Sequence, residues 1–217
     1  MRATRSVSIE TPTHGRVLVE EATESPASGL LVAFHGYGQN ADDVLGEVRQ
    51  IPGVSRWRIL AVQALHRFYT RDSEKVIASW MTREDREAAI RDNVEYVNRV
   101  IEQVPRAPGS SLCFLGFSQG AAMAYRAALL GRHRASGVIV VGGDIPPELK
   151  MSASREWPPV LIGAGVSDSW YTATKLDADV AFLVSQDIPH EVIRFAGGHE
   201  WTDELRRAVG DWLASEV

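Results

Sequence analysis

Six short runs of apolar, mostly β-branched residues recur along the chain, and they limit the possible folds more than any other feature. Each run is bounded by Gly, Pro or polar residues, and none alternates strictly between apolar and polar positions. This pattern predicts strands that are buried on both faces, which is typical of a parallel sheet between helices. The six runs are Leu30–Phe34, Ile59–Val62, Leu112–Leu115, Val138–Val141, Val160–Ile162 and Val192–Phe195.

Longer segments with a helical period separate most of these runs. The clearest is expected to span about 20 residues and to end at Pro105, with Thr82 and Asp85 as its capping box. Its apolar face consists of Ile90, Val94, Val97, Ile101 and Val104. Further helices are predicted over Asn40–Ile51, Ser118–Gly131, Thr172–Gln186 and Thr202–Ala214.

This alternation predicts a three-layer α/β architecture, with a mostly parallel central sheet and helices on both faces. Ser6–Glu10 and Gly15–Glu20 are short and carry polar residues, which favours an antiparallel N-terminal edge hairpin. The 217 residues have an ordinary globular composition and suit one domain over 1–217, with no large cap domain. Ligands are expected at the carboxyl ends of the parallel strands.

Charge and cysteine content exclude several classes of protein. The net charge is -5 and the basic residues are scattered, which disfavours nucleic acid as a partner. One cysteine excludes a disulfide framework. No apolar run is long enough for a signal peptide or a membrane span, so the cytoplasm is the expected location.

Gly116-Phe117-Ser118-Gln119-Gly120 matches the pattern G-x-S-x-G. The pattern alone is weak evidence, because a chain rich in Gly and Ser can carry it by chance. Here it lies directly between a predicted strand and a predicted helix, which is the setting of a nucleophile elbow. Ser118 is therefore the candidate nucleophile, and the structural alternative is a Gly-rich turn in which Ser118 only caps the helix.

A serine hydroxyl needs a base and a carboxylate that orients the base, and both are expected later in the chain. His199 follows the last strand directly, whereas His133 and His190 lie away from the carboxyl ends of the strands. Asp168 follows the strand Val160–Ile162 and is the candidate acid, with Asp144 as its competitor. Asp177, Asp179 and Asp187 are interpreted as solvated surface residues.

Acyl transfer also needs two N–H donors for the oxyanion of the transition state. The Gln119 backbone, directly after the nucleophile, is expected to supply one. The segment His35-Gly36-Tyr37-Gly38 follows an early strand, so the Tyr37 N–H is the second candidate. The His35 ring is expected to support this loop rather than take part in the chemistry, and a simple Gly-rich turn is the structural alternative.

From about Leu30 to Trp212 the chain resembles the phospholipase/carboxylesterase family of small α/β-hydrolases without a cap. The resemblance rests on the motifs quoted above, on Ser79-Trp80, on Gly165-Val166-Ser167-Asp168 and on Gly198-His199. It implies an α/β-hydrolase fold, with Ser118, Asp168 and His199 as the triad and Tyr37 and Gln119 as oxyanion donors. The chain departs from the thioesterase members at Gln39-Asn40 and over Leu65–Tyr69.

The resulting hypothesis is a carboxylesterase (a carboxylic ester hydrolase, EC 3.1.1) that acts on small to medium acyl groups without a metal or organic cofactor. Phe68, Trp80, Trp170 and Trp201 are expected to border an open substrate groove, and an exposed aromatic cluster would also suit a homodimer contact. The alternatives are a lysophospholipase or acyl-protein thioesterase, a dienelactone-type lactone hydrolase, a peptidase or amidase, and a non-catalytic binding module. A dienelactone hydrolase usually carries cysteine as nucleophile, and Cys113 lies in a predicted strand upstream.

Overall fold

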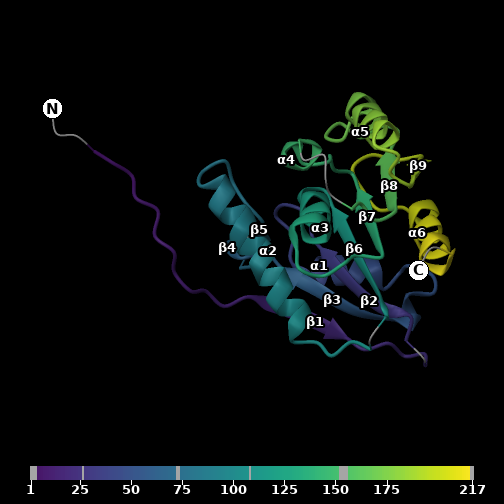
Figure 1. Cartoon of the computed structure of the whole chain (residues 1–217), viewed down its shortest axis with the longest axis horizontal. Coiled ribbons are helices and arrows are strands. Elements are labelled where there is room, and N and C mark those ends of the chain that lie inside the picture. The colour runs from purple at the N-terminus through teal and green to yellow at the C-terminus, as the bar shows by residue number, and fades with distance from the viewer. Residues whose placement is uncertain (1–3, 26, 72–73, 108, 152–155, 216–217) are drawn as a thin grey trace.

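The computed structural model of the protein describes residues 4–25, 27–71, 74–107, 109–151 and 156–215. Its centre is a seven-stranded sheet in the order β1-β3-β2-β6-β7-β8-β9 (Figure 1). β1 pairs antiparallel with β3, and all the other pairs in this sheet are parallel. The strands are β1 Arg16–Glu20, β2 Gly29–Phe34, β3 Trp57–Gln63, β6 Ser111–Phe117, β7 Gly137–Val141, β8 Val160–Gly165 and β9 His190–Phe195.

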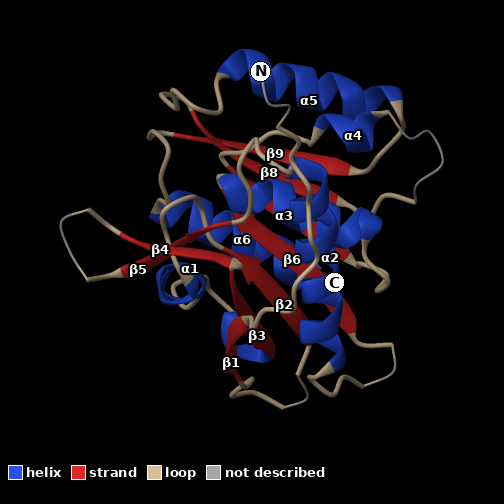
Figure 2. Ribbon diagram, turned by 90° about the vertical axis from the view of Figure 1, so that its left-hand side faces the viewer, coloured by secondary structure: helices blue, strands red, loops and turns tan. Residues whose placement is uncertain are grey.

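Helices cover both faces of this sheet (Figure 2). They are α1 Ala41–Val48, α2 Arg86–Glu102, α3 Gln119–Leu130, α4 Pro147–Lys150, α5 Ala173–Ser185 and α6 Asp203–Ser215, with a short 3-10 helix over Val54–Arg56. Successive residues of a strand point to opposite faces. Leu30, Val32 and Phe34 of β2 therefore pack with α2, α3, α4 and α5, whereas Leu31 and Ala33 pack with α1 and α6.

The structure confirms the predicted mostly parallel sheet with helices on both faces, and the described residues contain no large cap. Each of the six predicted runs lies within an observed strand. None of the helices in the described ranges combines the length and the apolar character needed to cross a membrane.

The predicted N-terminal hairpin is wrong. Ser6–Glu10 forms no strand and is exposed throughout, and in Figure 1 this segment extends away from the body of the molecule. Only Arg16–Glu20 forms a strand, which pairs with the edge of β3 instead. Pairing with β3 lets Val17 pack against the core, whereas a hairpin with the polar Ser6–Glu10 would bury little apolar surface.

The start of α2 also differs from the prediction. Asp85 precedes the helix with a positive φ of 47° and its side chain caps nothing, so the capping box with Thr82 does not form. The Thr82 hydroxyl instead accepts a hydrogen bond from the Glu84 N–H at 3.2 Å. α1 does begin with a capping box, made by Asn40 and Asp43.

A second, two-stranded sheet was not predicted. It is an antiparallel hairpin of β4 His66–Tyr69 and β5 Val76–Ser79. The sequence of β4 lacks the continuous apolar run that marks the central strands, because all four of its residues are exposed and none has to be buried in the core. An isolated bridge between Gln39 and Ala78 joins this hairpin to the loop after β2.

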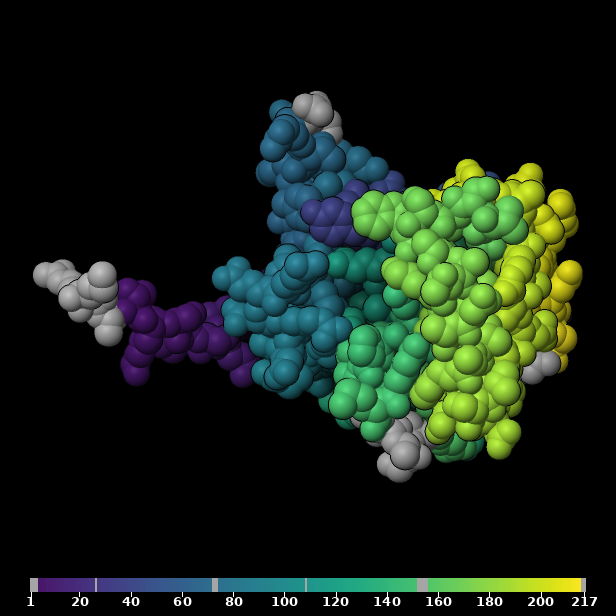
Figure 3. Space-filling view, turned by 90° about the horizontal axis from the view of Figure 1, so that it is seen from above, coloured from purple at the N-terminus to yellow at the C-terminus, as the bar shows by residue number. Residues whose placement is uncertain are grey.

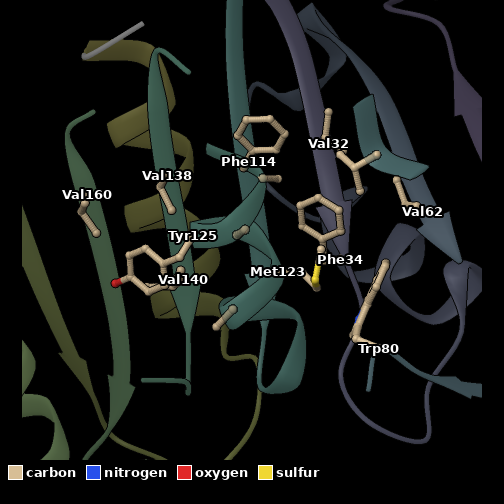
Figure 4. Close-up of a cluster of buried hydrophobic side chains, with 14 of the residues drawn as sticks. Val32, Phe34, Val62, Trp80, Phe114, Met123, Tyr125, Val138, Val140 and Val160 are labelled. Atoms are coloured by element: carbon tan, nitrogen blue, oxygen red, sulfur yellow. The ribbon is translucent and has the colours of Figure 1, made fainter. Parts of the chain in front are cut away.

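An aromatic cluster fills the core beside this loop (Figure 4). The Phe34 ring is fully buried, and its centre lies 5.4 Å from that of Trp80 and 6.1 Å from that of Phe114.

We expect Phe34→Ala to lower the free energy of unfolding by about 3–5 kcal/mol, because it leaves a cavity among these rings. Phe68→Ala removes the same atoms from a partly exposed position and is expected to cost less than about 1 kcal/mol. Urea unfolding of both variants measures the difference. Equal losses would contradict the assigned core.

Candidate active site

Ser118 makes the entire turn between β6 and α3. The strand ends at Phe117 and the helix begins at Gln119. Ser118 has φ 55° and ψ -119°, a backbone conformation that costs a non-glycine residue energy and persists only where the surroundings enforce it. The structure therefore has the strand, sharp turn and helix of a nucleophile elbow.

Glycines on both sides of Ser118 allow the backbones to approach closely. A Cβ atom added at Gly116 would lie 2.1 Å from the Gly120 carbonyl oxygen, and one added at Gly120 would lie 2.2 Å from the Phe34 carbonyl oxygen. Both distances are far below a van der Waals contact. Strand, turn and helix can therefore meet here only if both positions are glycine.

The structure brings Ser118, His199 and Asp168 together at the carboxyl ends of β6, β9 and β8. The Ser118 Oγ lies 2.8 Å from the His199 Nε2, and the His199 Nδ1 lies 2.7 Å from the Asp168 Oδ2. Both distances are those of hydrogen bonds. Parallel strands that end at one edge of the sheet thus bring together residues that lie far apart in the sequence.

The surroundings of Asp168 keep its carboxylate ionised. Its Oδ1 accepts hydrogen bonds from the Trp170 N–H at 2.7 Å and the Tyr171 N–H at 2.9 Å. Burial by itself raises the pKa of Asp168, but the hydrogen bonds from His199 and the two backbone N–H groups outweigh burial, so the pKa lies below its ordinary value. An ionised Asp168 accepts a hydrogen bond from the Nδ1–H of His199, which leaves Nε2 free to accept the Ser118 hydroxyl proton.

The competing histidines and acids are bonded to other partners. His190 is hydrogen-bonded through Nδ1 to the Ile188 carbonyl at 2.8 Å, and His133 lies beside Glu102. Asp144 forms an ion pair with Lys175 at 3.3 Å. Asp177 and Asp187 are exposed, as predicted.

The interpretation of Asp179 as a surface residue is wrong. Its side chain is almost completely buried and accepts hydrogen bonds from the Ile145 N–H, the Tyr171 hydroxyl and the Lys150 ammonium group. Its position on a helix suggested exposure, and no local pattern in the sequence indicates these three partners. Through Tyr171, whose N–H bonds to Asp168, Asp179 supports the loop that carries the acid.

The loop after β2 leaves one N–H group unused within the described part of the chain. The Gly36 N–H donates to the Gln39 Oε1 at 2.7 Å, and the Gln39 N–H donates to the Gly36 carbonyl. The Gly38 N–H donates to the Ala78 carbonyl at 3.0 Å, so the β4–β5 hairpin braces the loop. Tyr37 has the remaining N–H, and a Cβ added at Gly36 would lie 3.2 Å from the Ser118 Cβ, so the loop lies against the candidate nucleophile.

The His35 ring supports this loop, which is the role predicted for it. Its Nδ1 donates to the Gly36 carbonyl at 2.7 Å, and its Nε2 accepts from the Ala64 N–H at 3.1 Å. Burial lowers the pKa of His35, which favours the neutral ring that this bonding requires.

The Gln119 side chain has a bracing role that the sequence did not reveal. Its Oε1 accepts hydrogen bonds from the Trp80 N–H at 2.9 Å and the Ser79 hydroxyl at 3.2 Å, and its Nε2 donates to the Met81 carbonyl at 3.0 Å. The side chain therefore ties the segment after β5 to the start of α3. Within the described residues the Gln119 backbone N–H donates to no acceptor, so it remains a candidate oxyanion donor.

The four aromatic residues expected to border the groove lie in different surroundings. Trp80 is fully buried and donates from its ring nitrogen to the His35 carbonyl at 2.8 Å, so its predicted contact with substrate is wrong. Trp201 is half-buried and packs on Phe117. Phe68 packs beside the exposed Tyr37 ring, and Trp170 is exposed beside Ser118 and His199.

A groove with a volume of about 600 Å³ extends from Ser118 and His199 along α3 toward α4 and α5. Figure 3 views the molecule from above and shows it hollowed between the blue-teal segments and the green ones. No group of three or more His, Cys, Asp or Glu side chains in the described ranges is placed to bind a metal ion. Cys113 is buried, and burial raises the pKa of its thiol to about 12, so it is no alternative nucleophile.

Comparison with known proteins identifies the family. The phospholipase/carboxylesterase family matches residues 16–169. The solved structures with a similar fold include esterase PE8, with 21% identity and a TM-score of 0.73, over 94% of this chain and 100% of the esterase. Acyl-protein thioesterase 2 of Zea mays has 17% identity and a TM-score of 0.73, over 94% of this chain and 99% of the thioesterase.

A carboxylesterase of Bacillus cereus also has this fold, with 16% identity and a TM-score of 0.71, over 94% of this chain and 95% of that one. No curated protein matches the chain in sequence. The structural likeness confirms the α/β-hydrolase fold that the resemblance implied.

Removing the Gln119 side chain is expected to loosen the segment after β5 from the start of α3. We expect Gln119→Ala to lower the free energy of unfolding by about 1–3 kcal/mol, because the buried Trp80 N–H loses its acceptor. Gln50→Ala, which removes an exposed glutamine from the turn after α1, is the matched control and is expected to stay within about 0.5 kcal/mol of wild type. If thermal and urea unfolding give the same loss for both variants, the bracing role is wrong.

The low pKa of Asp168 predicts a pH-dependent stability. A carboxyl group whose pKa is lower in the folded state stabilises the fold above its unfolded pKa, and this contribution is lost as the pH falls through the folded pKa. We therefore expect the stability advantage of wild type over Asp168→Asn to be largest above about pH 5 and to shrink toward pH 3. Urea unfolding across this range measures it, and an advantage that grows on acidification would contradict the assignment.

Proposed function

The chain belongs to the phospholipase/carboxylesterase family of α/β-hydrolases, and on that premise we propose that it is a serine esterase that cleaves carboxylic esters through an acyl-enzyme. The observation that carries this proposal is the hydrogen-bonded series from Asp168 through His199 to Ser118. Ser118 is the nucleophile, His199 the general base and Asp168 the carboxylate that orients the base. Residues 1–217 are proposed to form a single catalytic domain.

In the first half of the reaction His199 removes the Ser118 hydroxyl proton as Oγ attacks the ester carbonyl carbon. The 2.8 Å hydrogen bond between Oγ and Nε2 is the path of this proton. Asp168 stays ionised and stabilises the imidazolium that forms. His199 then gives the proton to the leaving alkoxide, so the C–O bond breaks and an alcohol departs.

The negative charge that develops on the carbonyl oxygen is proposed to be stabilised by the N–H groups of Tyr37 and Gln119. Neither group has another acceptor within the described residues, and the loops that carry them are held by the Gln39 and Gln119 side chains. Donors fixed in advance stabilise a transition state without reorganising as the reaction proceeds. A water molecule activated by His199 repeats the sequence on the acyl-enzyme and releases the acid.

The groove supports small to medium acyl groups as substrates. Its volume of about 600 Å³ lies within the range of small-molecule sites, and it is open to solvent with no covering domain in the described residues. Lysophospholipids and acyl-proteins are the alternative substrates within the family. Esters, thioesters and lysophospholipids of matched acyl length, assayed side by side, separate these possibilities.

A fluorophosphonate tests the proposed nucleophile and base. We expect one adduct by intact mass on wild type and none on Ser118→Ala, because the probe reacts with an activated serine. His199→Ala is expected to be labelled slowly and to lose about 10⁴-fold or more in kcat for a 4-nitrophenyl ester.

His190→Ala is the matched control, since this histidine bonds to the Ile188 carbonyl outside the site, and wild-type labelling is expected. Asp168→Asn is expected to lose about 10⁴-fold in kcat, and Asp144→Asn less than about tenfold. If folded wild type remains unlabelled, or Ser118→Ala is labelled, the proposal fails.

A further inference from the structure

The groove beside Ser118 is lined by more charge than the ester reaction uses. One wall is formed by the turn before α3 and one face of this helix, with the residues Ser118, Gln119, Ala122 and Arg126. The opposite wall comes from α4, α5 and the loops before them. Its charged lining residues are Arg86, Arg126, Lys150, Lys175, Asp144 and Asp179.

Two of the cations are neutralised locally. The Lys150 ammonium group lies 2.6 Å from the buried Asp179 carboxylate, and that of Lys175 lies 3.3 Å from Asp144. Each of these pairs joins one positive and one negative charge. They contribute no net charge to the groove.

Arg86 and Arg126 share a single carboxylate. The Arg126 Nε donates to the Glu148 Oε1 at 2.8 Å, and an Arg86 nitrogen donates to the Glu148 Oε2 at 3.1 Å. Burial by itself raises the pKa of Glu148, but hydrogen bonds, including those from both arginines, hold it below its ordinary value, so Glu148 is ionised. Two guanidinium groups and one carboxylate leave one excess positive charge.

The two arginines differ in exposure. The Arg126 side chain is only 2% exposed, and within the described residues its only hydrogen-bond acceptor besides Glu148 is the Met81 sulfur, a weak acceptor, at 3.4 Å. The Arg86 side chain is 42% exposed, and within the described residues its only hydrogen bond is to Glu148. The buried Arg126 thus holds Glu148 in place, while the partly exposed Arg86 has further N–H groups for a ligand in the groove.

We propose that the cluster of Arg86, Arg126 and Glu148 binds a carboxylate carried by the substrate, so that the preferred substrates are esters with a second, ionised acid group. This inference rests on the proposed esterase function and deepens it by naming the substrate class. A guanidinium offers paired donors in the geometry that a carboxylate accepts. Binding there places a counter-ion beside the excess charge in a partly desolvated site, where ion pairing is stronger than in water.

The spacing in α3 indicates which substrates suit the site. Ser118 and Arg126 are eight residues apart, about 12 Å along a helix axis, and an arginine side chain on a helix leans back toward its N-terminus. The carboxylate is therefore expected several carbons from the scissile carbonyl. Monoesters of adipate and suberate meet this requirement.

The test compares 4-nitrophenyl monoesters of adipate and suberate with the neutral hexanoate and octanoate esters. We expect wild type to favour the anionic ester of each pair by about tenfold or more in kcat/KM. Arg86→Gln is expected to lose about 10- to 100-fold on the anionic esters and less than about twofold on the neutral ones. Arg91→Gln makes the same charge change at an exposed position on α2 outside the groove. It is expected to leave kcat/KM for the anionic and the neutral esters within about twofold of wild type.

A binding measurement keeps this inference separate from the esterase proposal. Titration calorimetry is expected to detect adipate binding to wild type and to Ser118→Ala, and binding to Arg86→Gln that is at least about tenfold weaker than to wild type. If neutral esters are hydrolysed as fast as anionic ones and adipate does not bind, the carboxylate site is wrong and the esterase proposal is unaffected. Adipate binding without hydrolysis of any ester would support the carboxylate site and overturn the esterase.

Discussion

The strained backbone at Ser118 is the constraint on which the rest of the site depends. A positive φ at a serine raises the energy of the turn, and the turn is kept because β6 and α3 are locked on either side of it. Gly116 and Gly120 make this possible by letting the strand, the helix and β2 come within backbone contact. The strain exposes one hydroxyl at the start of a helix, where neighbouring N–H groups favour negative charge.

The parallel sheet then determines what reaches that hydroxyl. β8 and β9 lie beyond β7 in the sheet, and the loops at their carboxyl ends carry Asp168 and His199 to the same edge. Rigid strands fix these loops better than a free surface segment would, which suits a site that depends on distances of 2.7–2.8 Å. On the other side, the β4–β5 hairpin holds the loop with Tyr37, and the Gln119 side chain ties the segment after this hairpin to α3.

Elements with strong local signals could be predicted from the sequence. The buried strands are continuous apolar runs, and the elbow has its own motif between a strand and a helix, so Ser118, Asp168 and His199 could be selected by their positions after strands. The exposed hairpin lacks such a signal, because β4 gains its order from pairing with β5 rather than from burial. The burial of Trp80 and Asp179 could not be foreseen, since both depend on partners distant in sequence, His35 for Trp80 and Ile145 and Lys150 for Asp179.

A crystal structure of the fluorophosphonate adduct is the decisive measurement, because the phosphonyl group resembles the tetrahedral intermediate. We expect a bond from phosphorus to the Ser118 Oγ, with the phosphonyl oxygen about 2.7–3.1 Å from the Tyr37 and Gln119 nitrogens. The Ser118 backbone is expected to keep its positive φ. An adduct on another residue, or a phosphonyl oxygen that points away from both N–H groups, would show that Ser118 and these two N–H groups do not form the catalytic site.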